Sequence, residues 1–140
     1  MKLTQLGPCG LVLLLVLVLP VGVSADDETE AAERAAVVWL SLVDAGLYEL
    51  SWKEAATLFR KSVSASDWVK AASAAREPLG NLVDRNLVTA TYSTTLPGAP
   101  DGEYVVLQFR TVFENKAQAI ETVTPMLDDG RWRVSGYYVR

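Results

Sequence analysis

The sequence predicts an α+β domain, with about three N-terminal helices packed on one face of a curved, cone-like, four-stranded antiparallel sheet. Between residues 29 and 75, apolar residues recur every three or four positions, which is typical of helices with one buried face. After Gly80, apolar and polar residues alternate and β-branched residues dominate, which is typical of strands. Helices and strands therefore occupy separate parts of the chain, as in α+β proteins.

The first 25 residues differ from the rest. Lys2 is followed by an unbroken run of Leu and Val over residues 11–19, and then by the small residues Val23-Ser24-Ala25. This order is typical of a secretory signal peptide cleaved after Ala25. The alternative, an uncleaved membrane anchor, would need ~20 apolar residues. We therefore expect a cleaved signal at 1–25 and a single domain at 26–140, exported to the periplasm or secreted.

Composition argues against several classes of function. The 140 residues carry a net charge of −4, and loss of Lys2 with the signal makes it −5. An acidic domain is a poor partner for nucleic acid or an anionic membrane surface, so we expect neither after signal cleavage. Cys9 precedes the apolar run and leaves with the signal, and the chain has no His, the commonest general base and metal ligand. We expect no cofactor, no metal and no catalytic residue.

Three helices are predicted, at about 29–44, 51–62 and 64–75. The second begins at Ser51-x-x-Glu54, which has the pattern of a capping box. Ser64 gives a weaker start signal of the same kind for the third helix, which ends before a Pro and a Gly.

Four strands are predicted, at about 88–93, 105–113, 119–127 and 131–140. Pro125 and Gly136 suggest an edge or a bulge in the last two, because Pro cannot donate to a strand ladder and Gly often marks a bulge. Between the first two strands, Ala-Pro100-Asp-Gly102 predicts a type I turn in which Gly102 takes a positive φ.

Several segments resemble one family. They include Trp39-Leu-x-Leu-Val-Asp-Ala-Gly46, Leu96-Pro-Gly-Ala-Pro-Asp-Gly-Glu-Tyr-Val-Val-Leu-Gln-Phe109 and Gly130-Arg-Trp-Arg-Val-Ser-Gly-Tyr-Tyr138. Together these resemble the bacterial exported family called domain of unknown function 4019. The resemblance implies a periplasmic or secreted bacterial protein, with an architecture similar to the cystatin-like and nuclear-transport-factor-2-like cone. It implies no established activity and no catalytic residues.

Some residues face the predicted interior. Trp39, Trp52 and Tyr92 belong to a set of aromatic residues that either fills the core or lines a ligand cavity. Asp44 and Glu121 are the carboxylates to inspect for acid–base chemistry there. Asp44 lies in the last turn of its helix, where an acid opposes the helix dipole, and a bond to a nearby Arg would account for it.

Gln108 and Arg110 lie on the less apolar face of the central strand. They either recognise an anionic ligand or a partner, or Arg110 pairs with Glu121 across the sheet.

The leading hypothesis is a non-catalytic exported domain that binds an envelope protein or a small ligand. The alternatives are a small-molecule hydrolase or isomerase that uses the cone interior, and a homodimerising structural module.

Overall fold

The computed structural model describes residues 17–140. Most of the predicted signal peptide, including Cys9, lies outside the described residues. Residues 17–24 have no regular secondary structure, and the first helix begins at Ala25 with Ser24 as its N-cap. Within the described part of the chain, no helix is both long enough and apolar enough to cross a membrane.

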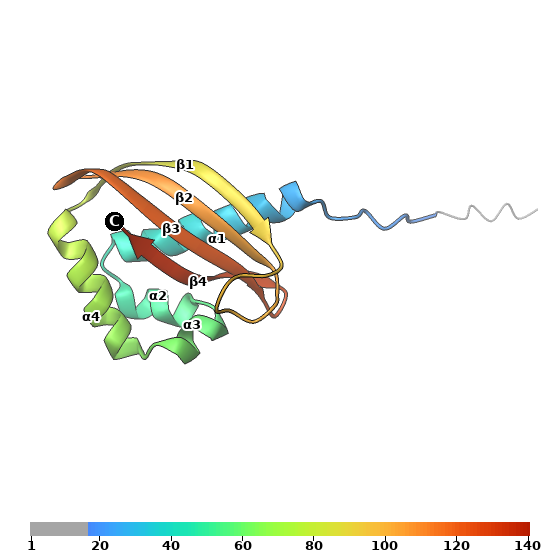
Figure 1. Cartoon of the computed structure of the whole chain (residues 1–140), viewed down its shortest axis with the longest axis horizontal. Coiled ribbons are helices and arrows are strands. Elements are labelled where there is room, and N and C mark those ends of the chain that lie inside the picture. Colours follow the sequence, from blue (N-terminus) through green and yellow to red (C-terminus); the bar gives the residue numbers. More distant parts are fainter. Residues whose placement is uncertain (1–16) are drawn as a thin grey trace, which may run out of the picture.

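The order of elements confirms the predicted α+β class, because residues 17–140 form four helices and a short 3-10 turn followed by four strands (Figure 1). The helical half contains α1 (Ala25–Asp44), α2 (Tyr48–Glu54), α3 (Thr57–Ser62), α4 (Ala65–Arg76) and η1 (Glu77–Leu79). The strands are β1 (Leu82–Ser93), β2 (Tyr104–Phe113), β3 (Lys116–Asp128) and β4 (Arg131–Val139).

The strands form one antiparallel sheet in the order β1-β2-β3-β4, which is not closed into a barrel. Helix α1 runs along one face of the curved sheet and packs against all four strands, while α2, α3 and α4 gather near β4 (Figure 1). The space between helices and sheet is therefore the interior, and among residues 17–140 no helix packs on the other face of the sheet.

The predicted second helix is wrong in its boundaries, because two helices occupy that segment. The break falls at Ala55 and Ala56, which are both extended, and the Ala56 N–H donates to the Val134 carbonyl of β4 at 2.8 Å. The chain leaves the helix there to bond to the edge strand. Ser51 is consequently not an N-cap but a buried residue inside α2. The start signal at Ser64 is confirmed, since its hydroxyl accepts the Asp67 N–H at 3.2 Å.

All four predicted strands are confirmed, and three begin earlier than predicted. A register shift between Thr124 and Pro125 confirms the bulge expected near Pro125, although β3 is an internal strand. The predicted position of positive φ at Gly102 is wrong. Gly98 has a φ of 75° instead, in a turn that the Ala99 N–H closes on the Leu96 carbonyl at 3.2 Å.

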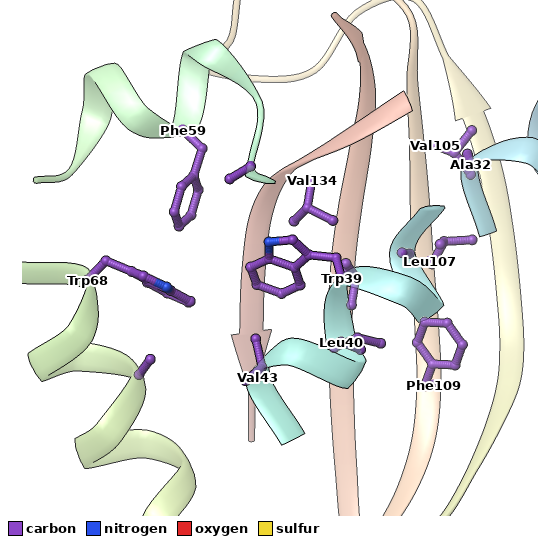
Figure 2. Packing of buried hydrophobic residues seen from close by; sticks show 14 residues of the cluster. Ala32, Trp39, Leu40, Val43, Phe59, Trp68, Val105, Leu107, Phe109 and Val134 are labelled. Carbon is purple, nitrogen blue, oxygen red and sulfur yellow. The ribbon is translucent and has the colours of Figure 1, made fainter. Parts of the chain in front are cut away.

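One end of the interior is filled by aromatic and aliphatic side chains, and we call it the aromatic end (Figure 2). Trp39 of α1 lies with its ring centroid 5.9 Å from that of Trp68, and Phe59 meets Trp68 edge-on at 5.0 Å. Leu107 and Phe109 of β2 close this core from the sheet side (Figure 2). Burial of each such side chain stabilises the fold by about 1.5–3 kcal/mol. The packing favours the core interpretation of the aromatic set over the ligand-cavity one.

Candidate functional site

Four charged side chains meet inside the domain, at the end where α1 and α4 terminate. We call Asp44, Arg76, Arg85 and Glu121 the charged cluster. Glu121 is fully buried, and the exposed fractions of the Arg76, Arg85 and Asp44 side chains are 4%, 10% and 17%. Charges buried to this degree are costly unless they are paired and hydrogen-bonded.

Each charge of the cluster is paired. Arg85 forms a bidentate ion pair with Asp44, in which Nη1 donates to Oδ2 and Nη2 donates to Oδ1, each at 2.8 Å. The Nε of Arg85 donates to Glu121 Oε1 at 2.8 Å. Arg76 Nη2 donates to Asp44 Oδ1 at 2.7 Å, and Arg76 Nη1 lies 3.9 Å from Glu121 Oε2. Two arginines thus balance two carboxylates in a closed ring of ion pairs.

The secondary structure brings these residues together from four elements. Asp44 and Arg76 are the last residues of α1 and α4. Arg85 of β1 lies opposite Thr111, and Glu121 of β3 lies opposite Phe109, so both project from the inner face of the sheet. The two arginines account for the acid at the end of α1, as predicted for Asp44.

Neutral groups complete the cluster around Glu121. Thr111 Oγ1 donates to Glu121 Oε1 at 2.7 Å, and the Tyr137 hydroxyl donates to Oε2 at 2.5 Å. The Arg76 guanidinium lies 4.6 Å from the centroid of the Phe113 ring, in cation–π contact. Within residues 17–140, the buried Nε of Arg76 has no hydrogen-bond partner. Both oxygens of Glu121 are therefore occupied by donors.

The electrostatics favour one protonation state for Asp44 and one for Tyr137. Burial alone would raise the pKa of Asp44, but hydrogen bonds and charge from Arg85 and Arg76 outweigh it and lower that pKa. Burial and the neighbouring Glu121 carboxylate raise the pKa of Tyr137 well above its usual range. At neutral pH, Asp44 is thus ionised and Tyr137 is neutral. A general acid or base works best with a pKa near the working pH, which Asp44 does not have.

The predicted pairing of Arg110 with Glu121 is wrong. Arg110 lies opposite Ile120, one position away from the Phe109–Glu121 pair. Successive side chains of a strand point to opposite faces, so Glu121 faces the interior while Arg110 is exposed on the outer face. Gln108 shares that outer face and accepts a hydrogen bond from Thr89 Oγ1 at 3.4 Å.

The three aromatic candidates make structural hydrogen bonds. Trp39 is 3% exposed, and its Nε1 donates to the Ser51 carbonyl at 2.8 Å. The Nε1 of Trp52 donates to the Val63 carbonyl at 2.8 Å, and the Tyr92 hydroxyl donates to Glu103 at 2.8 Å. The structure does not bring these three residues together with Asp44 in one cavity.

A surface depression adjoins the charged cluster at Asp44 and Arg76. It consists of two cavities that share Gly46 and Tyr48, and we call the pair the Gly46 cleft. The inner cavity, of about 310 Å³, is lined by Val43, Asp44, Ala45, Gly46, Tyr48, Arg76, Glu77, Gly80 and Asn81. The outer cavity, of about 410 Å³, is lined by Gly46, Leu47, Tyr48, Glu49, Leu50, Lys53 and Val69.

The sequence analysis did not single out Arg76 or Arg85, whereas Tyr48 belongs to the aromatic set that it named. Alternation from Ala90 and Tyr92 would place Arg85 on the outer face, and the register shift between Leu87 and Thr89 brings it to the inner face. Nothing in the sequence pairs it with Asp44, which is 41 residues away. In residues 17–140, no group of three or more His, Cys, Asp or Glu is arranged to hold a metal ion.

A family model described as "Protein of unknown function (DUF4019)" matches residues 35–137, most of the chain. This chain belongs to the DUF4019 family. Neither the curated proteins nor the solved structures compared with it gave a match. The DUF4019 match contains all four residues of the charged cluster and the whole Gly46 cleft.

Proposed function

We propose that this protein is a non-catalytic exported domain that binds a small ligand or a partner protein at the Gly46 cleft. The observation that carries the proposal is the closed pairing of the charged cluster beside an open depression. Asp44 is held by two arginines, and Glu121 accepts bonds from Arg85, Thr111 and Tyr137. An interior occupied in this way favours binding at the surface over a reaction centre within the cone.

Features outside the cleft support export. Residues 1–25 have the order of a signal peptide, and the rest of the chain is free of cysteine. The family resemblance implies a bacterial envelope or secreted protein, and a curved sheet covered on one face by helices agrees with a cystatin-like cone. We therefore place the binding domain in the periplasm or outside the cell.

The test compares two alanine-to-tryptophan variants of the untagged protein purified from its own cell envelope. Ala45→Trp fills the cleft from the helical end of α1, and Ala74→Trp, on the exposed side of α4, is the matched control. Native mass spectrometry should find a bound mass on the wild type and on Ala74→Trp but not on Ala45→Trp. Substrate turnover that disappears in a folded Asp44→Asn protein would instead support the hydrolase or isomerase alternative.

A second candidate function, homodimerisation, is favoured by the edge strand β1. Its side chains Leu82, Val83, Leu87 and Val88 are 36%, 62%, 37% and 50% exposed. Exposed apolar edge strands tend to pair with another chain. Light scattering of the domain should then show a dimer that Val83→Lys dissociates, whereas a strict monomer at all concentrations removes this candidate.

A further inference from the structure

We infer that the Gly46 cleft takes a ligand with a positively charged ammonium head and an apolar body. This inference rests on the proposed binding function and adds the chemistry of the ligand. Two observations carry it. The inner cavity is polar and the outer one is apolar, and the charges of the inner cavity that take part in no ion pair among residues 17–140 are negative.

The inner cavity presents negative charge. Within residues 17–140, no N–H donates to the main-chain carbonyls of Asp44 and Ala45, and the last turn of α1 has no basic residue. The C-terminus of a helix carries a partial negative charge from such free carbonyls. Glu77, which also lines the inner cavity, adds an exposed carboxylate that makes no ion pair within the described residues. A cation is favoured at this point.

The basic residues of the cleft are already engaged. Arg76 donates to Asp44, and Lys53 lies 3.5 Å from Glu49 in the outer cavity. Arg76 is therefore not free to attract an anion, and the exposed Lys53 charge is partly offset by Glu49. The neighbouring Tyr48 adds a phenol and a ring face, and burial together with the Glu77 charge raises the pKa of that phenol against the effect of Arg76, so it remains neutral. An aromatic face beside an ammonium group adds cation–π attraction.

The outer cavity is apolar by comparison. Leu47, at the N-cap of α2, and Leu50 of α2 are 50% and 42% exposed, and Val69 of α4 lines the same cavity. Exposed leucines beside a concave surface mark places where apolar groups bind. Because Gly46 and Tyr48 line both cavities, the two lie side by side, and the proposed ligand places its head at the end of α1 and its chain along the leucines.

The test uses n-octylammonium and octanoate, two probes with the same chain length and opposite charge, in calorimetric titrations of the whole domain. Octylammonium should bind about tenfold or more tightly than octanoate. Glu77→Gln should weaken octylammonium binding several-fold. Glu30→Gln, which removes an exposed carboxylate far along α1, is the control with the same change in net charge and should have no effect. Leu50→Ser should weaken both probes.

Each contrary result has its own meaning. Octanoate binding as tightly as octylammonium, or binding unaffected by Glu77→Gln and Ala45→Trp, overturns the assigned chemistry or its position. If neither probe binds while an envelope-derived mass still depends on Ala45, the ligand class is wrong and the binding function stands. If neither probe binds and no mass is found, both proposals fail.

Discussion

The interior has two ends, and Trp68 at one and Glu121 at the other are both withdrawn from solvent. At the aromatic end, burial itself stabilises the fold, since apolar surface leaves water. At the charged cluster, burial costs several kcal/mol per ion, which pairing only offsets. Replacement of buried ion pairs by apolar side chains of similar size is often neutral or stabilising in proteins. The charged cluster is thus poorly explained by stability alone, and it adjoins the Gly46 cleft, where we propose that a ligand or partner binds.

The largest loss of stability should come from the substitution Glu121→Gln. The substitution keeps the shape but leaves Arg85 and Arg76 with one carboxylate between them. Removal of one partner of a buried pair generally costs about 3–5 kcal/mol, so the free energy of unfolding should fall by that amount in urea titrations. Arg85→Met combined with Glu121→Leu should recover much of the loss. A Glu121→Gln protein within about 1 kcal/mol of wild type would show that the cluster is not closed.

The next largest effect should appear at alkaline pH, where Tyr137, at the charged cluster, makes the free energy of unfolding depend on pH. The raised pKa of Tyr137 means that the folded state keeps a proton that the unfolded state loses near pH 10. Its contribution to stability is therefore complete below pH 10 and declines above it, by up to about 1.4 kcal/mol per pH unit. Tyr137→Phe should remove this contribution to the slope of the free energy of unfolding against pH between pH 10 and 11.5. Tyr48 and Tyr92 contribute equally to the slopes of the wild type and the variant. Identical slopes would mean that Tyr137 is not held neutral.

A smaller loss of stability is expected when a buried polar group of the aromatic end, the Ser51 hydroxyl, is removed. Ser51 is fully buried, its hydroxyl accepts the Trp68 Nε1–H at 2.9 Å, and its own proton goes to the Tyr48 carbonyl at 2.7 Å. Ser51→Ala leaves the indole without a partner and should cost about 1–3 kcal/mol. Ser41→Ala, at an exposed helical serine, is the matched control and should stay within about 0.5 kcal/mol. Equal effects of the two changes would argue that the Trp68 bond is unimportant.

The smallest change should be Arg110→Ala. Since Arg110 is exposed on the outer face and does not reach Glu121, thermal unfolding should shift by less than the equivalent of about 0.5 kcal/mol. A loss similar to that of Glu121→Gln would restore the cross-sheet pair that the sequence suggested.

The sequence was sufficient for the fold because its signals are local. The helical spacing before Gly80, the alternation after it and the start signal at Ser64 depend on near neighbours, and all are confirmed. The break of the second helix was not visible, because its cause is a hydrogen bond from Ala56 to Val134, 78 residues along the chain.

The site was predictable only in part, for the same reason. Asp44 was conspicuous because an acid at a helix C-terminus needs an explanation, and the explanation by an arginine is confirmed. The arginine assigned to Glu121 was the wrong one, because strand register decides which residues share a face. The Gly46 cleft depends on how α1, α2 and η1 meet, and no local pattern encodes that arrangement.

The protonation of Asp44 tests most directly whether the charged cluster is a closed structural unit rather than a reaction centre. Its side-chain carboxyl carbon can be followed by NMR from pH 2 to pH 8 in the folded domain. Because Arg85 and Arg76 lower its pKa, the midpoint should lie below about 3.9, the value of an unperturbed aspartate. The matching stability is then present above pH 3.9 and is lost as the pH falls through the lower, folded-state pKa. A midpoint near pH 6–7, where a general acid or base would titrate, would contradict the account.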